Sequence, residues 1–93
     1  MRGVFAVLVT GIRSHALKGV ANLGNRPTVS GDKFLLEVHC FDFDQNIYGQ
    51  RIQVEFCCWI RNEKKFIGPE ALQTQIRKDI DQVRHWFRDC FAE

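Results

Sequence analysis

Two segments of the chain alternate between apolar and polar side chains, and this pattern constrains the fold more than any other feature of the sequence. They span residues 34–43 and 51–60. Successive side chains of a β-strand point to opposite faces of the sheet, so a period of two is typical of strands with one buried face. Because only a short polar stretch separates the segments, we expect them to pair as an antiparallel hairpin.

The alternation also predicts which side chains face the core. In the first segment the core face is purely apolar and consists of Phe34, Leu36, Val38 and Cys40. In the second segment the inward side chains are Ile52, Val54, Phe56, Cys58 and Ile60. The other face of the first segment carries Glu37 and His39 among apolar neighbours, where an unpartnered charge is uncommon. Glu37 is thus a candidate general base or metal ligand. Spacing alone favours a solvent-facing or ion-paired glutamate, and a metal site with His39 lacks a third ligand.

The N-terminal part predicts two further strands. Residues 3–9 (GVFAVLV) form an apolar run that is typical of a strand buried on both faces. Residues 19–23 predict a second, short strand. We expect it to end at the stretch 24–27, because Pro27 cannot donate to a ladder of backbone hydrogen bonds.

The C-terminal part predicts a helix over residues 69–90. Gly68 and Pro69 are typical of a helix start. One apolar stripe follows at helical spacing, formed by Leu72, Ile76, Ile80, Val83 and Phe87. Strands within 3–60, a basic loop over 61–68 and this helix together predict one small α+β domain, mainly β, with a barrel-like sheet.

Composition excludes several classes of protein. A chain of 93 residues holds a single core. Its net charge of +2 is too balanced to indicate a nucleic-acid binder. The four cysteines form no spaced metal-binding pairs and no apolar run approaches a membrane span, so we expect reduced thiols in a cytoplasmic protein without a metal site.

Four stretches, in this order along the chain, resemble the bacterial riboflavin kinases. They are GVANLGNRPTV at 19–29, LEVHCFDFD at 36–44, VEF with IRNEKKF at 54–66, and LQTQIRKDI at 72–80. The resemblance covers nearly the whole chain with the spacing of the family. In bacteria this domain is usually the C-terminal half of a bifunctional riboflavin kinase/FAD synthetase.

The resemblance implies a six-stranded Greek-key β-barrel with a C-terminal helix. It implies transfer of the γ-phosphate of ATP, with Mg²⁺, to the 5′-hydroxyl of riboflavin, giving FMN. It assigns Glu37 as the catalytic carboxylate that accepts the hydroxyl proton. The residues that it assigns to nucleotide binding are Cys40, Asp42 and Tyr48. Those that it assigns to a flap over the flavin are Arg61, Lys64 and Phe66.

The sequence departs from the family at the Mg–ATP-binding G-x-P-T-A-N motif, which does not occur in it. Pro27, Thr28 and Val29 belong to a different stretch and lack the asparagine. We therefore expect little or no kinase activity from the 93 residues alone. We also expect a barrel incomplete at its N-terminal side, whose exposed strand edges either support a homodimer or leave the N-terminus loosely ordered.

Two other hypotheses remain open at this point. The first is a non-catalytic barrel that binds a flavin, a nucleotide or another protein. The second, ranked last, is a small barrel that binds single-stranded nucleic acid through Phe41, Phe43, Tyr48 and Lys64. It ranks last because the carboxylates of Asp42 and Asp44 would repel phosphates.

Overall fold

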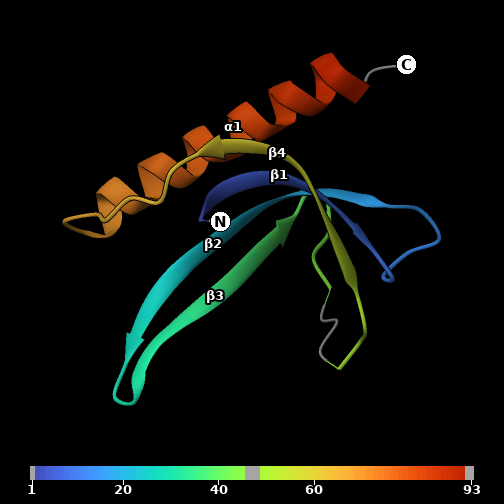
Figure 1. Cartoon of the computed structure of the whole chain (residues 1–93). Helices are drawn as coiled ribbons and strands as arrows, with labels where there is room; N and C mark the ends of the chain where they lie inside the picture. The colour runs from blue at the N-terminus through green and yellow to red at the C-terminus, as the bar shows by residue number, and fades with distance from the viewer. Residues whose placement is uncertain (1, 46–48, 92–93) are drawn as a thin grey trace.

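The computed structural model describes residues 2–45 and 49–91 and consists of one antiparallel sheet and one helix (Figure 1). The elements are β1 (Gly3–Thr10), β2 (Leu17–Thr28), β3 (Gly31–Cys40), β4 (Gln53–Arg61) and α1 (Pro69–Phe91). Their order across the sheet is β3-β2-β1-β4. The predicted class, mainly β with a C-terminal helix, is confirmed.

β1 lies in the interior of the sheet, between β2 and β4. Val4, Val7 and Val9 are each at most 2% exposed, as expected for an apolar run that has protein on both faces. The prediction of a strand buried on both faces is therefore confirmed. β1 provides the frame on which the other strands and the helix are placed.

The predicted hairpin of the two alternating segments is wrong, because β3 and β4 lie at opposite edges of the sheet. β3 pairs with β2 instead, through a tight turn at Val29 and Ser30 with Thr28 opposite Gly31. Closing this short turn costs less chain entropy than closing the longer connection over 41–52. β4 then pairs with the free side of β1.

The predicted end of the second strand at 24–27 is also wrong, since β2 continues to Thr28. The β1 ladder reaches only Leu23, opposite Gly3. Beyond that point β2 has a strand partner on one side only. Pro27 can therefore turn its nitrogen away from β3, and a proline there removes no ladder hydrogen bond.

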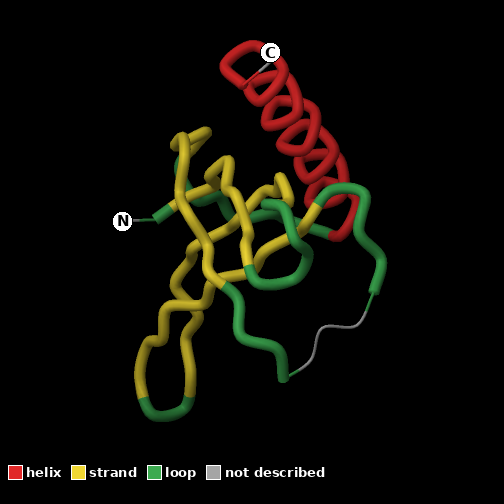
Figure 2. Tube along the Cα trace, turned by 90° about the vertical axis from the view of Figure 1, so that its right-hand side faces the viewer, coloured by secondary structure: helices red, strands yellow, loops and turns green. Residues whose placement is uncertain are grey.

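The curved sheet separates two apolar clusters. The inner cluster lies on the face away from α1 and is formed by Phe5, Val7, Val9 and Ala21. The helix-side cluster is formed by Ala6, Phe41, Val83 and Phe87. Figures 1 and 2 show α1 on one side of the sheet, with the β2–β3 hairpin extending away from it. The helix thus covers only part of its face of the sheet.

The far end of the β2–β3 hairpin corrects the expected core face of the first alternating segment. Val38 and Cys40 do pack against the inner cluster. Phe34 and Leu36, however, are 60% and 40% exposed, because Phe34 lies beyond the β1 ladder and Leu36 lies opposite its last paired residue, Leu23. The segment also ends as a strand at Cys40 rather than at residue 43.

Two irregularities in β4 divide its predicted inward residues between the two clusters. Val7 pairs with Phe56 and Ala6 with Cys58, so Cys57 is an extra, bulged residue; Ile60 is extra in the same way between Trp59 and Arg61. As a result Ile52, Val54 and Phe56 pack on the inner cluster, while Cys58 and Ile60 pack on the helix-side cluster. The bulges turn the end of β4 towards α1.

Candidate functional site

One row of side chains crosses the whole sheet on the face towards α1. Glu37 of β3 pairs with Asn22 of β2, Asn22 with Val4 of β1, and Val4 with Arg61 of β4. Residues directly opposite each other in antiparallel strands point to the same face. A carboxylate, an amide and a guanidinium therefore lie on one face, and Arg61 reaches this row only because of the bulges in β4.

A cavity of about 300 Å³ lies above this row, and we name it the Glu37 cavity. Its polar walls include Glu37, His39 and Arg61. Its apolar walls include Phe66 of the loop after β4 and Leu72 and Ile76 of α1. The first half of the helical stripe thus lines a cavity instead of the core. An apolar wall opposite a few polar groups is typical of a small-molecule site.

Arg61 is held in the wall of this cavity by a bidentate ion pair with Asp79 of α1. Its Nε donates to Oδ1 of Asp79 and its NH2 group donates to Oδ2, both at 2.7 Å. Gln75 Nε2 donates to the same Oδ1 at 3.0 Å, and Arg61 NH1 donates to the carbonyl of Asn62 at 2.9 Å. Asp79 is only 5% exposed, so a buried carboxylate fixes the direction of the guanidinium.

Asp79 was not among the residues predicted for the site, although the sequence carries a signal for it. It lies three residues after Ile76 and four before Val83, so it falls within the apolar stripe of α1. A carboxylate in such a stripe needs a cationic partner. The sequence shows this requirement, but the bulged register of β4 decides that the partner is Arg61.

Asn22 contributes a buried polar atom to the cavity. Its Oδ1 is buried and accepts no hydrogen bond from any residue that the structure describes. Buried acceptors are nearly always satisfied, by protein, water or a ligand. Its place in the wall of the Glu37 cavity is therefore consistent with a bound molecule that carries a donor.

The loop from 62 to 68 closes one side of this region. A second cavity of about 290 Å³ adjoins the first and shares Asn22, Phe66 and Leu72 with it. Lys64 lines this second cavity. Glu63 Oε2 accepts a hydrogen bond of 3.1 Å from the backbone N–H of Asn25, which ties the loop to β2. The three residues assigned to the flap thus lie at two adjoining cavities.

The residues assigned to the nucleotide are not brought together with Glu37. Cys40 pairs with Gly19 and packs against the inner cluster, on the opposite face of the sheet, where burial raises the pKa of its thiol. Asp42 lies on the helix side beyond β3, with a φ of 57° and an ion pair of 3.7 Å to Arg84. Tyr48 lies outside the described residues. The role of these three in nucleotide binding stays a prediction.

Residues 2–45 and 49–91 contain no group of three or more His, Cys, Asp or Glu side chains placed to hold a metal ion. No helix among them is long and apolar enough to cross a membrane.

Known proteins similar to this chain agree on one family. Residues 1–87 match the Flavokinase family model, described as riboflavin kinase. The bifunctional riboflavin kinase/FMN adenylyltransferases of Haemophilus influenzae and Escherichia coli are 51% and 44% identical to this chain, over 94% of its length. The chain spans 28% of the length of these curated relatives.

A solved structure has a similar fold. It is that of a protein described as a macrolide-efflux protein from Streptococcus pneumoniae, which matches 91% of this chain with a TM-score of 0.81 and 33% sequence identity. The chain covers 28% of that structure.

Proposed function

The chain belongs to the riboflavin kinase family, and from this premise we propose that it supplies the flavin-binding and proton-accepting part of a kinase that makes FMN from riboflavin and ATP. The observation that carries the proposal is the row from Glu37 to Arg61 beneath a cavity with an apolar wall. The comparisons name the family, and the row offers groups that suit its reaction.

The walls of the cavity suit riboflavin in two respects. Phe66, Leu72 and Ile76 offer apolar contact to a flat, largely apolar ring system. Arg61 uses three of its five N–H groups on Asp79 and Asn62, which leaves N–H groups that can donate to ring carbonyls. The acceptor Oδ1 of Asn22 suits a hydroxyl or imide N–H of the same molecule.

Glu37 is the proposed general base. Its carboxylate accepts the proton of the 5′-hydroxyl while that oxygen bonds to the γ-phosphorus of ATP and the bond from this phosphorus to the β,γ-bridging oxygen breaks. The products are FMN and ADP, and the proton remains on Glu37 until solvent removes it. The family implies Mg²⁺, but the described residues form no cluster that would hold it, so no step is assigned to the ion.

Riboflavin binding to the full 93-residue chain is the first test, followed through the quenching of flavin fluorescence. We expect binding by the wild type, and about tenfold weaker binding by Phe66→Ala because the ring loses its aromatic contact. Ile67→Ala is the matched control, since Ile67 is fully exposed in the same loop and lines none of these cavities. Absence of riboflavin binding by the wild type would contradict the proposal.

Formation of FMN from riboflavin and labelled ATP with Mg²⁺ is the second test, made at high chain concentration because we expect little turnover from the 93 residues alone. We expect Glu37→Gln to bind riboflavin within about threefold of the wild type and to form no FMN above background. Glu55→Gln is the control, because Glu55 is an exposed strand carboxylate outside the cavity. Equal turnover above background by Glu37→Gln and wild type would remove Glu37 from the reaction.

The setting of this reaction and the assembly of the chain are parts of the same proposal. Free cysteines at 40, 57, 58 and 90 support a reducing compartment, which we take to be the cytoplasm. β3 and β4 form the edges of the sheet and support pairing between two copies. Light scattering that gives the mass of a monomer at high concentration would contradict such a homodimer.

A further inference from the structure

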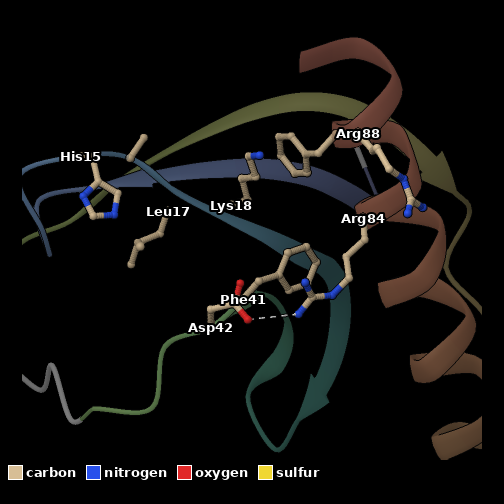
Figure 3. A pocket seen from close by; sticks show the side chains of 9 residues that line it. His15, Leu17, Lys18, Phe41, Asp42, Arg84 and Arg88 are labelled. Carbon is tan, nitrogen blue, oxygen red and sulfur yellow. Dashed lines mark ion pairs between the residues drawn. The ribbon is translucent and has the colours of Figure 1, made fainter. Parts of the chain in front are cut away.

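We propose that a separate cavity, on the same side of the sheet as the Glu37 cavity but at the other half of α1, binds the phosphate group of a ligand. We name it the Arg84 cavity. It has a volume of about 620 Å³ and lies between the loop that precedes β2, the turn after β3 and the C-terminal half of α1 (Figure 3). It shares no lining residue with the Glu37 cavity.

The charge of its lining residues favours an anion. Lys18, Arg84 and Arg88 are cationic, and Asp42 is the one carboxylate among the residues that line it, which gives +2 with His15 neutral. The whole chain also carries a net charge of +2, so the residues outside this cavity carry equal numbers of positive and negative charges. Arginine presents N–H groups in a planar fork that matches phosphate oxygens.

Arg84 is held in place before any ligand arrives. Its guanidinium lies over the ring of Phe41 at 4.3 Å from the centroid. Phe41 is buried in the helix-side cluster, and its backbone N–H donates to the carbonyl of Lys18 at 2.8 Å. The cation therefore rests on a fixed aromatic ring, which lowers the side-chain entropy lost on binding.

Asp42 does not compete strongly for this cation. Its Oδ1 is 3.7 Å from Arg84, beyond the distance of a good charge-assisted hydrogen bond, and its side chain is 85% exposed. Figure 3 shows Arg84 extending from α1 across Phe41 towards Asp42, with Arg88 on the helix and Lys18 on β2. A phosphate with up to two charges can displace so weak a partner and bind to Arg84. Arg88 NH2 lies 2.9 Å from Nδ1 of His85, and Arg88 and Lys18 add positive charge to the same cavity.

The rings beneath the cations are buried, with Phe41 5% and Phe87 2% exposed. Lys18 Nζ lies 5.6 Å from the centroid of the Phe87 ring, so the rings support the cations instead of binding the ligand. The group recognised is therefore the phosphate itself, which nucleotides and phosphorylated flavins both carry. That the source is ATP or FMN rests on the proposed function, whereas phosphate binding itself does not.

The first experiment titrates the ¹⁵N-labelled full chain with inorganic pyrophosphate and follows chemical shifts. We expect shifts in the backbone amides of Lys18 and Asp42 and in the Nε–H signals of Arg84 and Arg88. The double variant Arg84→Gln/Arg88→Gln keeps two polar side chains, removes both charges and should bind at least about tenfold more weakly. Arg77→Gln is the matched control, because Arg77 is exposed on α1 and lies outside the cavity.

The result that would overturn the proposal is unchanged affinity in the double variant, or shifts that lie elsewhere on the chain. A folded double variant is recognised by an amide spectrum dispersed like that of the wild type. Should it unfold, Arg84→Lys and Arg88→Lys, which keep the charge and lose the fork, should each reduce affinity by about threefold. No reduction in either would also overturn the proposal.

Titrations with ATP and with FMN then identify the source of the phosphate. Tighter binding of one of them than of pyrophosphate, lost in the double variant, identifies a nucleotide or a flavin phosphate; equal binding identifies the phosphate alone. Riboflavin carries no phosphate and should bind the wild type and the double variant equally. Failure of riboflavin to bind would count against the proposed function and would leave the Arg84 cavity unaffected.

Discussion

The two halves of α1 carry one apolar stripe but meet different partners. In the C-terminal half, Val83 and Phe87 are 0% and 2% exposed and close the helix-side cluster. In the N-terminal half, Leu72 and Ile76 are 42% and 44% exposed and line the Glu37 cavity. The same spacing thus stabilises the fold at one end of the helix and forms a binding wall at the other.

The sheet face below the helix explains this difference. Beneath the C-terminal half it presents Ala6 and Phe41, which can pack against the stripe. Beneath the N-terminal half it presents Glu37 and Arg61, whose polar groups need hydrogen bonds and replace part of the apolar surface that the stripe could pack against. A gap in apolar packing therefore coincides with the row of candidate functional groups.

Truncation of Phe87 should cause the largest loss of stability. A small loss would contradict the assignment of the C-terminal half of α1 to the core. Phe87→Ala leaves a hole in the helix-side cluster and should lower the free energy of unfolding by about 3–5 kcal/mol, measured by urea denaturation. Leu72→Ala, its counterpart in the other half, should cost less than about 1 kcal/mol. Equal losses for the two variants would mean that both halves of α1 are core.

Loss of the Asp79 carboxylate should have the next largest effect, because it joins the two regions. Asp79→Asn leaves the Arg61 guanidinium, 16% exposed, without its bidentate partner and should cost about 3 kcal/mol in the same measurement. It should also weaken riboflavin binding by changing the direction of Arg61.

Asp81→Asn is the control for this loss, since Asp81 is an exposed carboxylate two positions along α1. The free energy of unfolding of this variant should lie within about 0.5 kcal/mol of that of the wild type. An Asp79→Asn variant as stable as Asp81→Asn would show that the ion pair does not hold α1 to β4.

A moderate effect confined to binding is expected for Ile76. Ile76→Ala removes part of the apolar wall of the Glu37 cavity and should weaken riboflavin binding by about three- to tenfold, with less than about 1 kcal/mol lost in stability. Fluorescence titration and urea denaturation measure the two quantities on the same samples. A large loss of stability with unchanged affinity would assign Ile76 to the core.

The smallest effect is a pH dependence of stability that comes from two strand thiols, Cys40 and Cys57, and neither half of α1 contributes to it. Burial raises the pKa of Cys40 above its ordinary 9.0, and burial with the nearby Glu55 carboxylate raises that of Cys57. A thiol that holds its proton more tightly in the folded chain stabilises the fold below pH 9.0, and this contribution falls as the pH rises from there towards the folded pKa. Stability measured above pH 9 should fall less in Cys40→Ala than in the wild type, and an identical fall would contradict the assignment.

Local patterns in the sequence predicted most of the elements of the fold. The apolar run of β1, the period of the strands and the stripe of α1 are properties of neighbouring residues, and the structure has these elements close to the predicted positions. The pairing of the strands was mispredicted, because it depends on the cost of closing a turn at Val29 and Ser30 against a longer loop. Patterns within a strand contain no information on that competition.

The site shows the same division. The unusual placement of Glu37 was visible in its strand, and the resemblance pointed to Arg61 and Phe66, which the structure brings to the same cavity. Asp79 and the buried oxygen of Asn22 were missed, since their importance follows from the register across the four strands, which places Arg61 and Asn22 in one row. The alternation of polar and apolar residues stops at Cys57, since 57–60 is CCWI, but this apolar run does not show which residue is bulged.

The bulges in β4 have a consequence for how this segment can vary. Exchanging one side chain for another between Phe56 and Arg61 leaves the pairing with β1 in phase. Removing Cys57 or Ile60 would remove one bulge and still leave Arg61 opposite Val4, but the strand would lose the bend that this bulge adds. The extra residues therefore set the direction in which the end of β4 approaches α1, and natural variation that removes one of them should change the angle between this strand and the helix.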